Sequence, residues 1–167
     1  MVHKNDVEQL IAHFELQPHP EGGFYRETYR AMLSVKPSGH GVDRAACTAI
    51  YYLLCNGAWS AWHRIDADEM WHFYAGHGAT IHMFGADGLL TQRLGNPLCD
   101  PKASFQILVP AGRWFAAELT APDHFVLAGC TVAPGFEFSG FELADSAVLL
   151  RDFPEHSDLI NRLAAKN

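Results

Sequence analysis

Between Phe24 and Leu143, apolar and polar residues alternate or cluster in short runs, and helical spacing is absent. Examples of these runs are FYRETYRA, ATIHMFG and RWFAAEL. They are rich in β-branched and aromatic residues, and turn residues close each one, which is typical of β-strands. Many short strands at regular spacing predict an all-β sandwich or barrel. The turn GADG, Gly85 to Gly88, predicts a hairpin between two of them.

Helical spacing is found at the two ends of the chain. An amphipathic helix is predicted over about residues 4–15, because apolar residues recur there at intervals of three and four. These residues are Val7, Leu10, Ile11 and Phe14. A second short helix is predicted over about residues 157–165, with Ser157 as its N-cap. No linker or repeat divides the chain, so we expect one domain over residues 1–167 with its β-core at about 22–152.

Residues 49–54, with the sequence AIYYLL, are apolar at every position. A strand with one face in water would alternate, so both faces of this strand need a cover. One face can look into the core, and either the N-terminal helix or a second subunit can cover the other. Two-fold dimers are the most common soluble assembly, and we therefore expect a homodimer.

Composition and charge narrow the classes of partner. The chain has 167 residues, of which 49% are hydrophobic and 19% charged, as in ordinary globular domains. The formal net charge of −7 argues against a nucleic-acid or anionic-membrane partner, since both attract Lys and Arg. No apolar run approaches the roughly 20 residues that a membrane span needs. The first residues lack the apolar core of a signal peptide, so we expect a cytoplasmic protein.

The cysteines agree with a reducing compartment. Cys47, Cys55, Cys99 and Cys130 form no CxxC pair, and two of them lie inside apolar runs. A zinc–thiolate site is therefore not expected. We expect free and mostly buried thiols.

The stretch SAWHRIDADEMWHFYAGHG, Ser60 to Gly78, carries the densest chemistry, with three histidines, three acids and two tryptophans. Its spacing resembles the first motif of the cupins, in which two histidines and a glutamate follow a glycine at fixed intervals. His63 and Glu69 match that motif, and Ile65 stands where metal-binding cupins have the second histidine.

The second cupin motif is matched only in part. Pro110, Ala111 and Gly112 fit its Pro-x-Gly, but Phe115 stands where metal-binding members have a third histidine. The resemblance thus provides two of the four usual ligands. We expect no tightly bound metal or other cofactor.

Four longer strings resemble one uncharacterised cupin family, known as DUF985 or Cupin 5. They are PHPEGGFYRETYR, WHRIDADEMWHFYAG, LVPAGRWFAA and GCTVAPGFEFSGFELAD. The resemblance implies a cupin jelly-roll β-barrel with short N- and C-terminal helices, usually dimeric, and a pocket inside the barrel. It implies no particular reaction, since a fold hosts many functions.

His63 and Glu69 are the expected catalytic pair. Both face the barrel interior in related cupins, and a buried imidazole and carboxylate need partners. His63 is expected to serve as general acid or base, with Glu69 orienting it or sharing its proton. By analogy with metal-free epimerases of this fold, the expected reaction is isomerisation or epimerisation beside a carbonyl of a sugar or sugar nucleotide. The alternative is a structural ion pair.

Four further residues are candidates for ligand binding. Trp114 or Phe115 could stack on a sugar-like or ring-bearing ligand. Arg26 could hold an anionic ligand near the barrel mouth, or lie on a solvated edge strand. Strict alternation places His72 on the face opposite Glu69, unless a β-bulge reverses it.

Two other readings of the site stay open. The first is a metal-dependent enzyme that holds a divalent transition metal with His63, Glu69 and His72. The second is a non-catalytic binding or storage module. His77 and His82 are expected on the surface or in turns.

Overall fold

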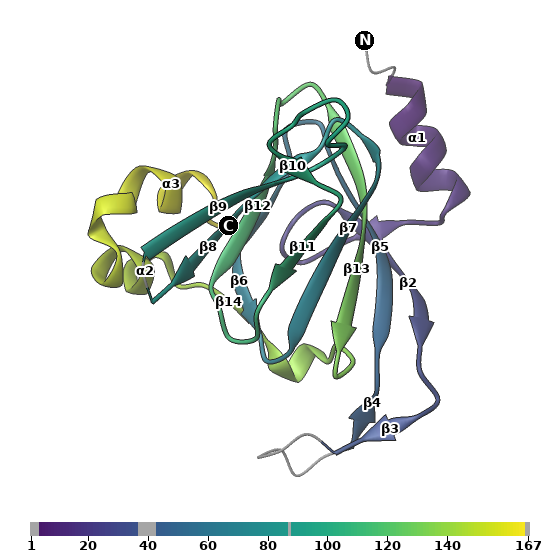
Figure 1. Cartoon of the computed structure of the whole chain (residues 1–167), viewed down its shortest axis with the longest axis horizontal. Helices are drawn as coiled ribbons and strands as arrows, with labels where there is room; N and C mark the ends of the chain where they lie inside the picture. Colours follow the sequence, from purple (N-terminus) through teal and green to yellow (C-terminus); the bar gives the residue numbers. More distant parts are fainter. Residues whose placement is uncertain (1–3, 37–42, 87, 166–167) are drawn as a thin grey trace.

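The computed structural model describes residues 4–36, 43–86 and 88–165. Two six-stranded, mainly antiparallel sheets face each other as a jelly-roll sandwich (Figure 1). Short helices flank the sandwich at its two ends. The prediction of an all-β jelly roll is thereby confirmed, although the two sheets do not join into a closed barrel.

Each sheet combines strands from distant parts of the chain. The first sheet runs, in order, β1 (Gln17–Pro18), β2 (Phe24–Arg30), β5 (Thr48–Cys55), β13 (Phe125–Ala133), β7 (Asp68–Gly76) and β11 (Gln106–Val109). The second sheet runs β10 (Ala103–Ser104), β9 (Gly88–Leu94), β8 (Ala79–Gly85), β12 (Phe115–Leu119), β6 (Trp59–Ile65) and β14 (Phe141–Leu143). A separate two-stranded ribbon consists of β3 (Ser34–Val35) and β4 (Arg44–Ala45). The predicted hairpin joins β8 to β9, with Gly85 paired to Gly88.

The main core lies between the two sheets. Its largest fully buried side chains include Tyr52, Trp71 and Phe115. Along β7, Glu69 and Trp71 are buried in the interior, whereas His72 is bonded to side chains on the outer face. The alternation expected from the sequence therefore holds through this part of β7.

Helix α1 (Lys4–His13) covers part of the outer face of β5. Leu53 and Tyr51 pack in one cluster with Val7 and Phe14 of the N-terminal segment. The second apolar face of β5 thus has a cover within the chain at this end. The homodimer stays a prediction, but the covered part of this strand does not support it.

The C-terminal region contains more helix than the sequence predicted. Helix α2 (Ser146–Asp152) lies where the β-core was expected to continue to residue 152, and the Asp145 carboxylate caps it by accepting from the Ala147 N–H at 2.9 Å. Two 3₁₀ turns, η1 (Phe138–Gly140) and η2 (Pro154–His156), and helix α3 (Ser157–Arg162) complete the region.

The predicted N-cap at Ser157 was wrong. His156 occupies the cap position, because η2 runs directly into α3 and gives Ser157 a helical φ of −53°. Helices α2 and α3 bury Leu149 and Ile160 against Trp62 and Phe84 on the outer face of the second sheet.

In the described part of the chain, no helix is long and apolar enough to cross a membrane. The four cysteines are unpaired, as expected. Cys55 and Cys130 are buried, and Cys99 is exposed.

Candidate functional site

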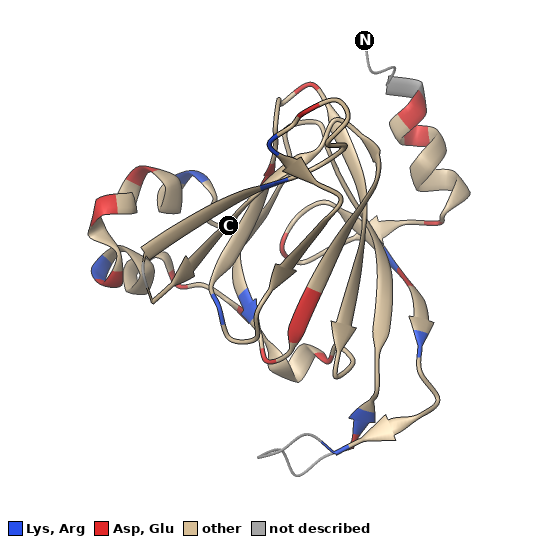
Figure 2. Ribbon diagram, viewed as in Figure 1, with Lys and Arg blue, Asp and Glu red and all other residues tan. Residues whose placement is uncertain are grey.

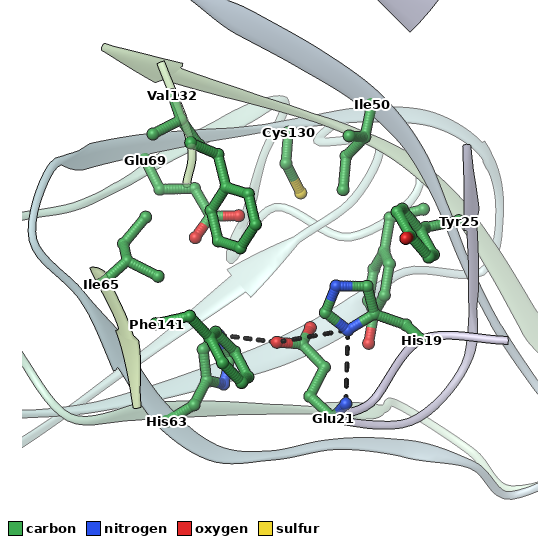
Figure 3. A pocket seen from close by; sticks show the side chains of 12 residues that line it. His19, Glu21, Tyr25, Ile50, His63, Ile65, Glu69, Cys130, Val132 and Phe141 are labelled. Atoms are coloured by element: carbon green, nitrogen blue, oxygen red, sulfur yellow. Dashed lines mark hydrogen bonds and ion pairs between the residues drawn. The ribbon is translucent and has the colours of Figure 1, made fainter. Parts of the chain in front are cut away.

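A pocket lies between the sheets at the end where β6 turns into β7 and where β13 ends (Figure 3). The side chains that line it are His19, Glu21, Tyr25, Ile50, Tyr52, His63, Ile65, Glu69, Cys130, Val132, Phe136 and Phe141. The space open to the centres of water-sized molecules is about 40 Å³. A water molecule needs about 10–15 Å³ by this measure, so the pocket takes only a few heavy atoms.

Both ring nitrogens of His63 face hydrogen-bond acceptors. Nδ1 lies 2.7 Å from the Ala61 carbonyl oxygen, and Nε2 lies 2.9 Å from Oε2 of Glu21. Burial lowers the pKa of His63, but the Glu21 carboxylate outweighs it and the net shift is upward. His63 is therefore an imidazolium that donates to both neighbours and forms a buried ion pair with Glu21.

Glu21 is held as a carboxylate by several donors. Its Oε1 accepts a hydrogen bond from Ser60 Oγ at 2.9 Å, and its backbone carbonyl accepts from the Ala61 N–H at 2.8 Å. Burial raises the pKa of Glu21, but the charge and the hydrogen bond of His63 overcome it and bring the pKa to about 2. The result is a fixed pair of opposite charges at one side of the pocket.

The loop before β2 can bring Glu21 this close only because glycine follows it. Gly22 has φ +117°, and a Cβ there would lie 2.1 Å from the Trp59 carbonyl oxygen. Any side chain at this position would clash with backbone and strain the turn. The two glycines of HPEGG thus allow the loop to pass against β6 and place Glu21 beside His63.

Glu69 lies on the first sheet, opposite His63, and its carboxyl group differs from that of Glu21 in its pKa. Its residue is 7% exposed, and burial raises its pKa to about 7, although the positive charge of His63 opposes that shift. Its hydrogen-bonding neighbour is the thiol of Cys130, whose own pKa is raised well above its usual value, mainly by burial. Glu69 is therefore a carboxyl group that gains and loses a proton near neutral pH.

His19 contributes a neutral imidazole. Its Nδ1 accepts from the Glu21 N–H at 3.3 Å, which leaves the proton on Nε2, and Nε2 points toward the middle of the pocket (Figure 3). Burial lowers the pKa of His19, although Glu21 raises it. The ring packs edge-on against Tyr25 with a centroid distance of 4.5 Å.

The structure brings His63 and Glu69 into one pocket, but it places three other candidates elsewhere. Phe115 packs behind His63, with ring centroids 4.0 Å apart, and does not line the pocket. Trp114 lies under the guanidinium of Arg64 at 4.3 Å and packs with the C-terminal helices. Arg26 is exposed and paired with Glu15 at 2.5 Å, so it lies on the solvated edge strand.

His72 is on the outer face of the first sheet. Its Nε2 is 3.1 Å from Thr131 Oγ1, and its Nδ1 accepts from Gln106 Nε2 at 3.0 Å. Burial lowers its pKa. The structure therefore does not bring His72 together with His63 and Glu69, because the side chains of Glu69 and His72 lie on opposite faces of β7.

His82 is not a surface histidine, contrary to the expectation. It is 7% exposed, with Nδ1 3.0 Å from Thr91 Oγ1 and Nε2 3.0 Å from Glu118 Oε1. Glu118 in turn pairs with Arg162 of α3. Arg162 thus links α3 to the second sheet, and within this network His82 is the buried member. His77 is exposed and stacks on His124.

A divalent transition metal does not fit the residues present. Ile65 lines the pocket where metal-binding cupins place a histidine, and Phe115 fills the position of another. Both nitrogens of His63 are already engaged. Across the residues that the structure describes, no three His, Cys, Asp or Glu side chains gather to hold a metal ion.

The sequence reasoning missed His19 and Glu21 as site residues. HPEGG was used only as part of a string that resembles the cupin family, and its polar groups were not assigned to the pocket. The pair of glycines after Glu21 was the available signal, since consecutive glycines often permit a close backbone approach.

Fold and site together define a cupin-type jelly roll with an ionisable pocket. The family model described as "Cupin superfamily (DUF985)" matches residues 8–144, and the chain belongs to this family. A crystal structure of a Shewanella oneidensis protein shares 39% identity over 100% of both chains, with a TM-score of 0.86. A hypothetical protein from Leishmania major shares 29% identity over 95% of this chain and 98% of its own, also with a TM-score of 0.86.

More distant similarities concern the fold alone. Oxalate decarboxylase from Bacillus subtilis is 14% identical over 90% of this chain, with a TM-score of 0.55. The match covers 37% of that enzyme's chain. The oxalate decarboxylase of Lactobacillus farciminis is 16% identical over 91% of this chain and 42% of its own, with a TM-score of 0.56. No curated protein matches the chain.

Proposed function

We propose that this protein binds a small molecule in the pocket and transfers protons beside a carbonyl group, without a metal, as in isomerisation or epimerisation. One observation carries the proposal: Glu69, with a pKa of about 7, shares the pocket with the fixed His63–Glu21 ion pair. An acid–base catalyst works best when its pKa is close to the working pH. Ionisable groups with strongly shifted pKa values cluster at catalytic sites.

The geometry favours Glu69, rather than His63, as the general acid–base group. Both N–H groups of His63 donate to protein acceptors, which leaves the ring no lone pair for a substrate proton. Its charge instead keeps Glu21 ionised. The positive charge of His63 only partly offsets the effect of burial on the pKa of Glu69, and Glu69 faces the pocket from the opposite sheet.

The proposed chemistry moves one proton between two carbons through Glu69 and one proton between two oxygens. The Glu69 carboxylate removes a proton from the carbon next to the carbonyl, the C–H electrons form a C=C bond, and the carbonyl electrons move to oxygen. The His19 Nε2–H, which points into the pocket, donates to that oxygen as negative charge develops. The hydroxyl group on the deprotonated carbon then passes its proton to the former carbonyl oxygen. Glu69 returns its proton to the former carbonyl carbon, and the oxygen that lost its proton becomes the carbonyl oxygen.

The experiment is solvent hydrogen exchange followed by proton NMR in D₂O. Glycolaldehyde, a neutral hydroxycarbonyl compound small enough for the pocket, is the substrate, with wild type, Glu69→Gln and Glu142→Gln compared. Glu142 is an exposed glutamate paired with Arg64, so its variant is the matched control. We expect exchange at a carbon next to the carbonyl to fall by about 100-fold or more in Glu69→Gln and to persist in the control. Equal exchange in the two variants, or none in wild type, would refute the proposal.

Two further properties belong to the same proposal. The protein is a homodimer, which exposed apolar side chains such as Tyr74 and Leu108 on the first sheet support. It works in the cytoplasm, which the four unpaired cysteines support.

A further inference from the structure

We infer that the pocket selects small neutral molecules that carry both a carbonyl-type oxygen and a hydroxyl or amide group, and that it rejects carboxylates and phosphates. This inference rests on the binding part of the proposed function and narrows its substrate class. It argues against a sugar nucleotide, which is anionic and larger than the free space.

The first argument is the charge of the lining. Among the described residues that line the pocket there is no Lys or Arg. The one cation among these lining residues, His63, is paired with Glu21 at 2.9 Å. Because the His63–Glu21 pair has no net charge, the ionised Glu69 carboxylate gives the cavity a net negative charge, which repels an anion in a poorly hydrated space.

The arginines nearest in sequence to the lining residues are also paired. Basic positions lie on β2, β4 and β6 (Figure 2). Arg30 bonds Glu27 at 2.9 Å and Glu137 at 2.6 Å, and Arg44 bonds Asp66 at 2.8 Å and the Gly135 carbonyl oxygen.

Arg64 completes this group. It bonds Glu142 at 2.6 Å and lies over the ring of Trp114. An incoming anion would have to break one of these ion pairs to gain a partner.

The second argument is the set of hydrogen-bonding groups. His19 offers one donor, Nε2–H, toward the cavity, and the carboxyl groups of Glu21 and Glu69 supply acceptors. A ligand that satisfies them needs an acceptor oxygen and a donor O–H or N–H. The remaining walls include Ile50, Val132 and Phe141, which are apolar and favour a compact ligand with few further polar groups.

The third argument is size. A free space of about 40 Å³ accommodates roughly three or four heavy atoms when a water needs about 10–15 Å³. Neutral hydroxycarbonyl compounds and small amides have this size and this pattern of donor and acceptor groups.

Acetamide and acetate test the inference because they have the same number and arrangement of heavy atoms and differ in charge. Protein chemical shifts are followed by NMR at about pH 8, where acetate is ionised. We expect acetamide to bind wild type at least about tenfold more tightly than acetate. Tighter or equal binding of acetate would overturn the inference, and so would the failure of both probes to bind at about 100 mM.

Glu21→Gln removes the anion that neutralises His63. If the variant folds, we expect its affinity for acetate at about pH 6 to exceed that of wild type at the same pH by about tenfold or more, because acetate replaces Glu21 as the anion that pairs with the His63 imidazolium. Glu8→Gln, at an exposed position on α1, is the control and should leave the affinity for acetate unchanged. Acetate affinity that does not rise in folded Glu21→Gln would contradict the charge argument.

These outcomes separate the inference from the proposed function. If acetate binds more tightly and hydrogen exchange depends on Glu69, the inference is refuted and the proton-transfer function is supported. If acetamide binds more tightly but no hydrogen exchange occurs, the proton-transfer function is refuted and the inference is supported.

Discussion

Nε2 of His63, on β6, lies 2.9 Å from Oε2 of Glu21, which comes from the loop before β2. The His63 residue is 2% exposed and that of Glu21 is 8% exposed, so water screens neither charge well. Removing one member of such a pair leaves the other charge buried without a partner, whereas removing both avoids that penalty.

Glu21→Gln is therefore expected to lower the free energy of unfolding by about 3 kcal/mol, because it leaves the His63 charge uncompensated. The double variant Glu21→Gln/His63→Gln should be more stable than the sum of the two single changes predicts. Urea denaturation of the four proteins at neutral pH measures both effects. Additive losses would show that the ion pair contributes no coupling energy.

Glu69→Gln should change how stability depends on pH. Its pKa is about 7 in the folded protein against 4.5 for an ordinary Glu, so the unfolded chain releases the proton first as pH rises. The contribution of Glu69 is complete below pH 4.5 and is lost as pH rises to about 7, which costs wild type up to about 3 kcal/mol. Denaturation of both proteins across this range should show the variant gaining on wild type as pH rises. A constant difference would mean that Glu69 has an ordinary pKa.

Gly22→Ala should damage the loop that carries Glu21. A Cβ at Gly22 would lie 2.1 Å from the Trp59 carbonyl oxygen at φ +117°, so we expect a loss of about 3 kcal/mol or more. Gly112→Ala is the control, since Gly112 has φ +76° but nothing within 4 Å of a Cβ, and it should cost only about 1 kcal/mol. Thermal melts compare the two. Similar losses would mean that the approach to Trp59 is not tight.

Protein purified without added metal should contain well under one transition-metal ion per chain. A chelator should leave its melting temperature unchanged, since an ion bound only to the native state would stabilise it. His72→Ala should alter neither result, because His72 bonds Thr131 and Gln106 on the outer face. Elemental analysis beside a chelator melt tests this. Near-stoichiometric metal that is lost in His72→Ala would instead support the ligand set His63, Glu69 and His72.

Sedimentation equilibrium should show a homodimer at micromolar concentration. We expect its interface on the outer face of the first sheet, where Tyr74 is 53% exposed and Leu108 is 45% exposed. Leu108→Glu should shift the protein toward monomer, because it places a charge in that interface. Lys102→Glu, at an exposed position before β10, is the control. A monomer in wild type would rule out the dimer.

The sequence by itself determined the strands and the inward direction of two site residues. Alternation along β7 separates Glu69 from His72, and the cupin-like spacing pairs Glu69 with His63. The first feature depends on the order of residues within a strand, because the two-residue period of a strand sets the face on which a side chain lies. Helix α1 was predictable for the equivalent reason, from its helical period. The second feature rests on the resemblance to the cupin motif.

Only the tertiary structure decided what those side chains meet. Glu21 and His19 lie far from His63 in sequence, and the loop brings them together because Gly22 permits its backbone to pass against Trp59. That contact engages the second nitrogen of His63 and leaves Glu69 as the carboxyl that titrates near neutrality. Periodicity fixes the face that a residue occupies on its own element, but the polar partner comes from another segment, and packing of the whole chain sets that partner and hence the pKa.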